Sequence, residues 1–372
     1  MINLYPKTNM RKSAGAVTLI ISIVLMVTTT LIIIFAADQG RIQEKMLSNL
    51  ARNKQAFYAA EAGMEYGINY FKQNSVAILA SPVSGYLQAY SNSNTTNVVL
   101  ADNSKYSFTY TNPIANNYTL IQITSTGTSS DGSAVRVISQ KIQLGSMLAT
   151  PPTTAVVTKG SLSLGGSSQI TNTTNNQTVQ SASTVSISGS AQTVTSSGSS
   201  SYAGHIAGDI SQNNTTLQNL SQSDFFSSYF GQPSTTMKNN AVNYYSSSSD
   251  TNYSSTLNGM TGTSIWIDQT SGTTTLNGST TIGSASQPVI LVVNGNLDLK
   301  GSLTIYGFIF VIGKTTTEVL GNVTINGGMV TTDNLNMTGS SQINYNSTIL
   351  SNIQNQSSMN FYAKVTGSWK DY

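Results

Sequence analysis

The feature that most constrains this chain is an uncharged segment close to its start. Ala16–Ala37 is 22 residues long and contains no charged residue, Pro or Gly. As a helix it would be about 33 Å long, enough to cross the hydrocarbon core of a bilayer. It is also longer than the apolar region of about 7–15 residues that is typical of a secretory signal peptide. Lys7, Arg11 and Lys12 precede it without an acidic residue among them, which predicts a cytoplasmic N-terminus.

The helical pattern continues past the apolar segment. Leu50, Phe57, Met64 and Phe71 are spaced by seven residues, as on one stripe of a helix. Further apolar residues lie on or beside this stripe: Ile42, Met46, Tyr58, Ala60 and Ile68. The sequence therefore predicts one helix over 16–75, of which 16–37 is transmembrane and 38–75 is amphipathic.

Two stretches resemble a known family. The run Gly15-Ala16-Val17-Thr18-Leu19, after a basic leader and before a long apolar helix, resembles a type IV prepilin cleavage site. The run from Asn53 to Gly63, NKQAFYAAEAG, resembles the helix signature of the PilX-type minor pilins. The chain end, Gly367–Asp371, also resembles the end of such proteins.

The resemblance implies processing and a set of signature residues. It implies that a prepilin peptidase removes the leader peptide 1–15 by cutting between Gly15 and Ala16, and that the new N-terminus is methylated. The signature residues it assigns to this chain are Phe57, Ala60, Glu61 and Gly63. We expect Glu61 to lie near the apolar stripe, where it either pairs with Arg52, Lys54 or another subunit or is solvated.

One position departs from the family pattern. Major pilins carry a glutamate at the fifth mature position, which is thought to neutralise a neighbour's N-terminal ammonium in the filament core; here that position is Ile20. A buried unpaired charge is costly. The departure therefore suggests a tip-proximal or priming subunit.

The residues after the helix predict a small antiparallel sheet over 76–150. Three segments alternate apolar and polar residues: Tyr106–Thr111, Tyr118–Thr124 and Ala134–Leu144. Gly127 and Gly132 lie in a hairpin connection between the last two. Pro151-Pro152 is interpreted as a domain boundary.

From 151 to 360 the chain is rich in Ser, Thr, Asn and Gly and repeats a short motif. The segments starting at Gly160, Gly295, Gly301 and Gly321 all read Gly, polar, apolar, polar, apolar. Such short strands with Gly and Asn turns predict a β-solenoid, in which each coil buries its apolar residues only against the next. An insertion at about 212–263 is expected to cap or flank it, and 361–372 forms a tail. The predicted fold class is α+β, a pilin helix and small sheet followed by a β-solenoid, with a β-sandwich as the alternative.

The sequence offers little for catalysis. It has no cysteine and one histidine, His205, which has no acidic neighbour along the chain. The aspartates of 151–360 are isolated from one another, so neither a metal site nor an acidic catalytic pair is predicted. No phosphate or dinucleotide motif occurs, and no catalytic, cofactor-binding or metal residue is assigned. Six aromatic residues are candidates for a sugar- or protein-binding surface, although packing is the favoured interpretation: Tyr202, Tyr229, Tyr244, Tyr245, Tyr253 and Trp266.

These observations predict a non-enzymatic minor type IV pilin, in the inner membrane before assembly and then on the cell surface in a pilus. The resemblance implies other minor and major pilins, the prepilin peptidase and a tip adhesin as partners; a net charge of +3 does not indicate nucleic acid. A membrane-anchored β-helical carbohydrate-active enzyme and a type II secretion pseudopilin remain as alternatives.

Overall fold

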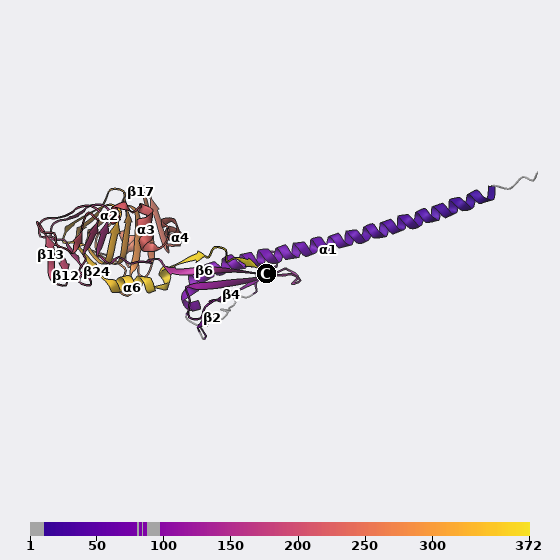
Figure 1. Cartoon of the computed structure of the whole chain (residues 1–372), viewed down its shortest axis with the longest axis horizontal. Helices are drawn as coiled ribbons and strands as arrows, with labels where there is room; N and C mark the ends of the chain where they lie inside the picture. Colours follow the sequence, from indigo (N-terminus) through magenta and orange to yellow (C-terminus); the bar gives the residue numbers. More distant parts are fainter. Residues whose placement is uncertain (1–10, 80–81, 84, 88–96) are drawn as a thin grey trace, which may run out of the picture. The chain divides into compact units, whose positions relative to one another are not determined.

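The computed structural model describes residues 11–79, 82–83, 85–87 and 97–372 (Figure 1). Contacts divide the chain into two units. The helix–sheet unit comprises the chain up to Asn117, Ile121–Lys141 and Val365–Tyr372. The solenoid unit comprises Tyr118–Leu120 and Ile142–Lys364. Most of the solenoid unit is thus inserted between Lys141 and Val365 of the helix–sheet unit.

One helix, α1 (Arg11–Leu79), dominates the helix–sheet unit. It extends the predicted 16–75 at both ends and includes residues 11–15 of the predicted leader; residues 1–10 lie outside the described residues. Its backbone departs from helical geometry at Asn74, where the side chain donates a hydrogen bond to the Tyr70 carbonyl. Before Asn74 the helix is continuous, which is consistent with the absence of Pro from its sequence.

An antiparallel sheet packs on the C-terminal part of α1. Its strands are β3 (Val98–Val99), β4 (Lys105–Thr111), β5 (Leu120–Thr128), β6 (Val135–Ser146) and β26 (Lys370–Asp371). Their order is β3-β4-β5-β6, and β26 pairs with β6. A separate pair is formed by β1 (Pro82–Val83) and β2 (Tyr86–Leu87). Alternate residues of β4 and β5 are buried, among them Tyr106, Phe108, Tyr110, Ile121 and Ile123. This alternation is the pattern from which the sheet was predicted.

The solenoid unit begins and ends on paired strands. The last five residues of β6 (142–146) pair antiparallel with β25 (Asn360–Lys364). The contact boundary therefore falls within β6, between Lys141 and Ile142, and not at Pro151-Pro152 as predicted. The two parts of β6 pair with different strands: residues 142–146 pair with β25, whereas Ile138 and Ser139 pair with β26. The contacts of the chain therefore change within β6.

Between these strands lie the following elements: β7 (Val156–Thr158), β8 (Leu162–Leu164), β9 (Gln169–Thr171), β10 (Val179–Ser181), β11 (Val185–Ile187), β12 (Gln192–Thr195), β13 (Gly198–Tyr202), β14 (Ile210–Ser211), α2 (Thr215–Asn219), α3 (Gln222–Phe230), α4 (Ser234–Asn240), β15 (Asn243–Ser247), β16 (Thr251–Asn252), α5 (Ser254–Leu257), β17 (Ser264–Leu276), β18 (Thr280–Ile282), β19 (Val289–Gly301), β20 (Leu303–Ile312), β21 (Thr316–Gly321), β22 (Thr324–Thr331), β23 (Asn334–Gly339), β24 (Gln342–Tyr345), α6 (Ser347–Asn355) and η1 (Ser357–Met359).

The strands form a β-solenoid whose coils pair in parallel. Val156, for example, lies opposite Val179 on one side and Met329 on the other. Because a β-sandwich is built from antiparallel sheets, these parallel pairings contradict the alternative fold. In space the coils stack in the order 179–195, 156–171, 329–345, 309–325, 289–305, 264–282 and 243–252.

The stacking order differs from the sequence order. The chain enters in the coil 156–171, winds to one end, and then crosses to the opposite end through 212–242, which contains α2, α3 and α4. From there it winds back until 329–345 meets the first coil. The predicted insertion is therefore the crossover connection together with the coil at 243–252. Two segments of similar sequence, Gly166–Ile170 and Gly339–Ile343, lie in adjacent coils.

A ladder of glycines fixes one corner of the stack. Its members all have positive φ, between 65° and 83°: Gly189, Gly166, Gly339, Gly321, Gly301 and Gly278. A Cβ on Gly339 would lie 2.8 Å from the Cα of Gly321 in the next coil. Both the backbone conformation and the close approach therefore require glycine at this corner.

One face of the solenoid is buried on both sides, because helices cover its outer surface (Figure 1). Val289, Leu291 and Val293 point into the stack, whereas Phe308 and Phe310 point outward against α3 and α6. The aromatic side chains of α3, Phe225, Phe226, Tyr229 and Phe230, pack on Phe308 and Phe310. The segments Val289–Val293 and Phe308–Val311 are therefore wholly buried.

Candidate functional site: the exposed apolar helix and its anchor

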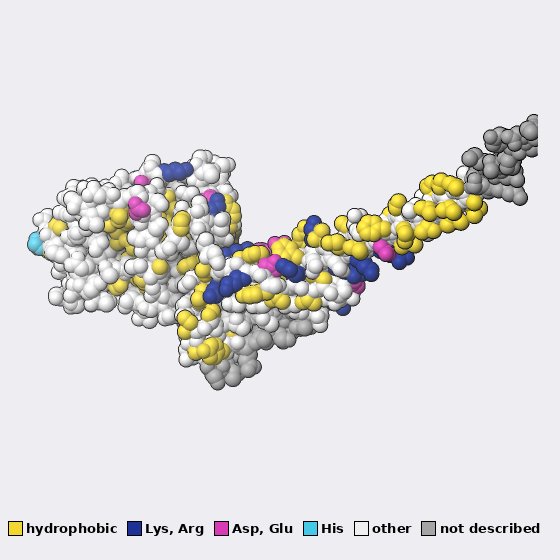
Figure 2. Space-filling view, turned by 45° about the vertical axis from the view of Figure 1, so that its right-hand side comes forward, with side chains coloured by type: hydrophobic (Ala, Val, Ile, Leu, Met, Phe, Trp, Pro, Cys, Tyr) yellow, Lys and Arg dark blue, Asp and Glu magenta, His cyan; other side chains and the backbone are white. Residues whose placement is uncertain are grey.

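The apolar segment of α1, Ala16–Ala37, is exposed along its whole length (Figure 2). Leu25 and Phe35 have 57% and 66% of their surface exposed, although both are large apolar side chains. Among the described residues, α1 contains the one helix segment that is long and apolar enough to cross a membrane. An apolar surface of this extent is stable only against lipid or against other apolar helices.

The hydroxyl groups of the apolar segment bond to the helix itself. Ser22 donates to the Thr18 carbonyl at 2.9 Å, and Thr28 donates to the Val24 carbonyl at 2.9 Å. Thr29 and Thr30 make the same kind of bond, at 2.8 and 2.7 Å. The hydrogen-bonding capacity of these hydroxyl groups is therefore satisfied without water, so their transfer into an apolar environment costs little free energy.

The predicted amphipathic stripe is buried over only part of its length. Ile42, Met46 and Leu50 are half or more exposed, and so is Tyr58. The buried side chains of α1 begin at Ala56 and include those of Ala60, Met64, Ile68 and Phe71. The chain's own sheet thus covers α1 from Ala56 onward, which leaves the apolar surface before it open to other partners.

Small residues allow the sheet to approach α1 closely. A Cβ added to Gly127 of β5 would lie 2.1 Å from the Ala56 carbonyl oxygen and 2.3 Å from the Ala60 nitrogen. A Cβ on Gly63 would lie 2.4 Å from Ser125 Oγ. The Tyr110 hydroxyl donates to the Gly67 carbonyl at 2.7 Å. Ala60 and Gly63 of the helix signature therefore lie at the contact between helix and sheet.

The other two signature residues lie outside this contact. Phe57 is half-buried, and its ring meets that of Trp369 edge to face with centroids 6.4 Å apart. Trp369 is 47% exposed, so it lies beside the helix without being part of the core. Glu61 is exposed, and within the described part of the chain it has no ion pair. Arg52, one of its expected partners, instead binds Asp131.

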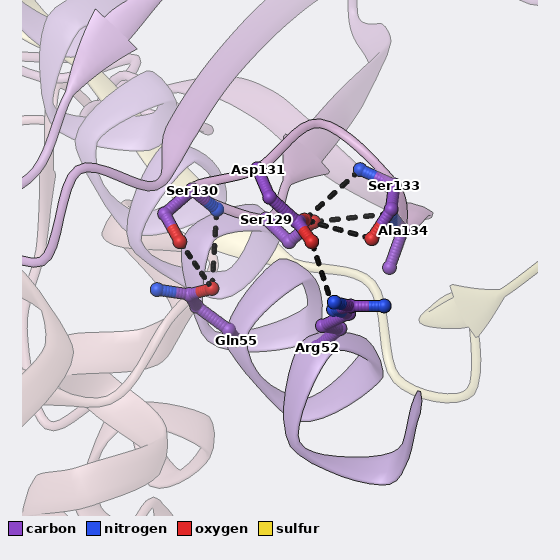
Figure 3. Close-up of polar contacts among 7 residues, drawn as sticks. All are labelled: Arg52, Gln55, Ser129, Ser130, Asp131, Ser133 and Ala134. Atoms are coloured by element: carbon purple, nitrogen blue, oxygen red, sulfur yellow. Dashed lines mark hydrogen bonds and ion pairs between the residues drawn. The ribbon is translucent and has the colours of Figure 1, made fainter. Parts of the chain in front are cut away.

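The turn between β5 and β6 is bound to α1 by polar contacts (Figure 3). The Nε of Arg52 lies 2.8 Å from an Asp131 carboxylate oxygen. The other oxygen accepts hydrogen bonds from the Ser129 and Ser133 hydroxyls, both at 2.7 Å, and from the Ser133 backbone N–H at 3.1 Å. These hydrogen bonds, from Ser129 first and then Ser133, together with Arg52, hold the pKa of Asp131 well below its ordinary value.

Gln55 joins two turns to the same part of α1. Its Oε1 accepts from the Ser130 N–H and hydroxyl at 3.1 and 3.2 Å. Its Nε2 donates to an Asp102 carboxylate oxygen at 3.0 Å. Asp102 in turn accepts from the Ser104 N–H and hydroxyl, and these bonds, with the one from Gln55, lower its pKa. We call the contacts of Arg52 and Gln55 with Asp131, Ser130 and Asp102 the anchor. No sequence motif marked these turn residues.

The predicted processing residues lie in the exposed part of α1. Gly15, Ala16 and Ile20 are all exposed, and Ile20 has 60% of its surface open. A Cβ on Gly15 would meet no atom within 4 Å. The roles assigned to these residues stay predictions.

Two acidic residues of the solenoid unit that are separated in the sequence, Asp298 and Glu318, are neighbours in the structure. Asp298 and Glu318 lie directly opposite each other in adjacent coils, and Lys300 contacts Asp298 at 2.8 Å. No sequence pattern predicts this pairing, because it depends on the register between coils. The Oδ2 of Asp333 is buried without a hydrogen-bond partner, and burial raises the pKa of this carboxyl group. Among the described residues, no group of three or more His, Asp or Glu side chains could hold a metal ion.

His205 lies between β13 and β14, which pair with β12 and β10 of the end coil 179–195. Its ring is 5.0 Å from that of Tyr202, and the two residues form a backbone bridge. Nearby, the buried carboxylate of Asp209 accepts hydrogen bonds from the hydroxyls of Thr178, Ser200 and Ser201. These hydrogen bonds join β13 to the residues that precede β10 and β14.

The six aromatic residues considered for a binding surface do not form one. Tyr229, Tyr253 and Trp266 are buried. Tyr202 and Tyr244 are about half exposed, at 52% and 48%. Tyr202 lies beside β12 at one end of the stack, whereas Tyr244 is in the coil at the other end.

Asp268 is the centre of a polar network beneath α4. The Nζ of Lys238 lies 2.5 Å from one oxygen, to which the Tyr244 hydroxyl also donates at 3.0 Å. Trp266 Nε1 and Asn294 Nδ2 donate to the other oxygen at 2.7 and 3.0 Å. Burial by itself would raise the pKa of Asp268, but the hydrogen bonds from these four groups outweigh it and lower the pKa to about 2.

No protein-family model matches the chain, and no curated protein is similar to it. The chain shows a weak structural likeness to the competence-associated pilin ComZ from Thermus thermophilus. The two chains are 12% identical, the match covers 86% of this chain and 97% of the other, and the TM-score is 0.24. A TM-score of this size does not establish a common fold.

Proposed function

We propose that this chain is a subunit of a type IV pilus, that it is processed at Gly15–Ala16, and that it acts as a minor, tip-located or priming subunit. The observation that carries the proposal is the exposed apolar segment of α1, which continues as one helix into a sheet that covers only its C-terminal part. Such a helix can reside in the inner membrane and then exchange lipid for the apolar helices of other subunits. The resemblance of its leader and signature residues to those of PilX-type pilins supports the same assignment.

The anchor gives this helix a fixed attachment to the part of the chain that would be displayed. Force on α1 during extraction from the membrane would pass into the sheet through the small-residue contact at Gly127 and through Arg52 and Gln55. Charge-assisted hydrogen bonds such as that of Arg52 with Asp131 are the stronger kind. The other pilins, the prepilin peptidase and a tip adhesin are the partners that this function requires.

The proposal includes a non-enzymatic role. The one acidic pair that faces across adjacent coils, among the residues described, is Asp298 with Glu318. Asp298 is bound by Lys300, so the pair is not a free acid and base. A type II secretion pseudopilin would need the same helix, and filament purification separates the two functions.

The test is the N-terminal mass of the protein in sheared filaments. The proposal expects a chain that starts at methylated Ala16. Intact Met1 in a chain confined to the membrane fraction, or recovery only with a secretion complex, would contradict it.

A matched pair of variants sharpens this test. Gly15 and Gly40 both lie in α1 with open space around them, so a Val side chain fits at either position. Gly15→Val is expected to block processing and filament entry, whereas Gly40→Val is expected to preserve both. Equal processing of the two variants would remove Gly15 from the cleavage site.

A further inference from the structure

One side of α1 carries exposed side chains that run from before the sheet to beside it. These side chains are Leu47, Leu50, Lys54, Tyr58 and Glu61. Because successive residues of an α-helix are rotated by about 100°, the five side chains lie within about 80° of one another around the helix axis. All five belong to the helix–sheet unit. We call these five residues the open face.

The open face combines large apolar side chains with two charges of opposite sign. Leu47, Leu50 and Tyr58 have 67%, 52% and 62% of their surface exposed. Within the described part of the chain, Lys54 and Glu61 form neither an ion pair nor a hydrogen bond. A protein that covers this face must therefore place apolar groups on the apolar residues, an anion beside Lys54 and a cation beside Glu61.

A more N-terminal part of α1 carries this complementary pattern. Leu31, Ile34, Asp38, Ile42 and Lys45 have the same spacing along the helix as the residues of the open face, so they also share one side of α1. All five are exposed. Both sets are apolar at the first, second and fourth positions, and their charges at the third and fifth positions are opposite in sign. We call this second set the complementary face.

We propose that the open face binds the complementary face of a second copy of this chain. Two parallel α1 helices that are displaced along their axes by about 24 Å bring the two faces level. The contacts are then Leu47 with Leu31, Leu50 with Ile34, Lys54 with Asp38, Tyr58 with Ile42, and Glu61 with Lys45. Without the displacement, Lys54 would lie level with Lys54 and Glu61 with Glu61, and like charges would repel.

The displacement prevents this contact while both copies are in the membrane. The hydrocarbon core of a bilayer is about 30 Å thick, so two copies that span it hold their apolar segments at the same depth. A displacement of about 24 Å would withdraw most of one apolar segment from the bilayer. The contact therefore forms only when a copy leaves the membrane, and in this respect the inference rests on the proposed filament function. One copy then supplies the docking surface for the next.

The absence of cysteine from the chain allows a test by disulfide formation. Two full-length chains are coexpressed, one with Tyr58→Cys and the other with Ile42→Cys. Mass spectrometry of sheared filaments and of membranes then identifies the linked peptides. The link between positions 58 and 42 is expected in filaments and not in membranes.

Leu50→Cys in place of Ile42→Cys is the control for register. Leu50 and Ile42 are similarly exposed, at 52% and 50%. In the proposed contact, however, position 50 would lie about 12 Å from Tyr58 along the helix axis. This displacement exceeds the Cα separation of about 7 Å that a disulfide allows, so little link to position 50 is expected.

An exchange of charges tests the pairing of Glu61 with Lys45. Glu61→Lys brings two cations together and Lys45→Glu brings two anions together, and each is expected to lower the number of copies in filaments about fivefold. The chain with both changes has an opposite pair again and is expected to enter filaments like the parent. Glu61→Lys with Lys72→Glu has the same net charge without the contact and should not be rescued. Misfolding caused by Glu61→Lys would not be repaired by Lys45→Glu either.

The inference is overturned if filaments lack the link between positions 58 and 42, or if membranes give it equally. It is also overturned if Lys45→Glu and Lys72→Glu rescue Glu61→Lys to the same extent. Filaments that contain the chain from methylated Ala16 onward, but without the link, would refute this contact alone. Absence of the chain from filaments would refute both the contact and the filament function.

Discussion

Gly127 of β5 lies so close to Ala60 of α1 that a methyl group at Gly127 would lie 2.3 Å from the Ala60 nitrogen. The same methyl group would lie 2.1 Å from the Ala56 carbonyl oxygen. Both obstacles are backbone atoms of a helix, which cannot move without displacing the whole helix. The attachment of α1 to the sheet therefore depends on the absence of a side chain at Gly127.

We predict that Gly127→Ala weakens the attachment of the sheet to α1. Overpacking of this kind costs about 1–3 kcal/mol, and we expect the upper part of that range because the neighbouring atoms are backbone. Hydrogen exchange of the β4 and β5 amides measures the effect, which should appear as faster exchange.

Gly40→Ala is the control for this prediction, since a Cβ at Gly40 meets nothing within 4 Å. It replaces a glycine of α1 that lies outside the contact with the sheet, so it should leave the exchange of β4 and β5 unchanged. Unchanged exchange in Gly127→Ala as well would mean that the sheet does not depend on this close contact.

A second prediction concerns pH and the anchor. Hydrogen bonds from Ser129 and Ser133, together with Arg52, lower the pKa of Asp131 in the folded chain. A lowered pKa contributes stability that is present above the unfolded pKa, about 3.9, and is lost as pH falls through the folded pKa. Protection of the turn between β5 and β6 against proteolysis should therefore decrease as the pH falls below about 4.

Asp131→Asn tests whether this carboxylate is the cause. At pH 7 the variant should be cleaved faster than the parent chain in the turn, and acidification should add little further. Ser130, whose hydroxyl binds Gln55 and not Asp131, supplies the comparison. Ser130→Ala should keep the pH dependence of the parent, and an Asn variant with the parent's acid response would refute the assignment.

A third prediction concerns the network beneath α4. The pKa of Asp268 is about 2 because hydrogen bonds from Lys238, Trp266, Asn294 and Tyr244 outweigh its burial. Its contribution to stability is full above about pH 4 and is lost as the pH falls toward 2. Lys238→Met removes the ammonium group and should shift this loss to higher pH. Trp266 fluorescence in the Trp369→Phe background follows the transition.

Lys105→Met removes a lysine from β4 in the helix–sheet unit and serves as the control. It should leave the acid transition of Trp266 where it was. The two lysine variants behaving alike would mean that net charge, and not the contact with Asp268, sets the transition.

The sequence predicted the elements whose signal is local. The helix of 16–75 followed from one uncharged run and a seven-residue spacing, and α1 contains it. Strands β4, β5 and β6 followed from alternation, because one face of each lies on the core. The solenoid followed from repeated Gly-polar-apolar segments, and two of their glycines, Gly301 and Gly321, lie in the glycine ladder at one corner of the coils.

What the sequence did not predict depends on register and connection between distant segments. The coil order places 329–345 against 156–171, which no local pattern encodes. Asp298 and Glu318 are neighbours only because β19 and β21 of adjacent coils pair in this register. The anchor was missed because Asp131 and Ser130 occur in an ordinary turn, whose function appears only when the turn meets Arg52 and Gln55. The exposed part of the stripe, at Ile42, Met46 and Leu50, was missed because periodicity shows a face but not what covers it.

The fourth prediction concerns Ile20, which is 60% exposed within an apolar segment that contains no carboxylate. In a filament, a neighbour's N-terminal ammonium placed beside this segment would have no counter-charge, and an unpaired buried charge is costly. We predict that Ile20→Glu supplies the counter-charge and raises the number of copies along the filament shaft. Mass spectrometry of sheared filaments measures the ratio of this chain to the major subunit, and immunogold labelling shows where it lies. Ile20→Gln has a similar shape without the charge and should be labelled like the parent, for which the proposed role expects few copies at the filament end. If the Glu and Gln variants enter the shaft equally, or if the parent already labels the whole shaft, the missing carboxylate does not confine this subunit to the end.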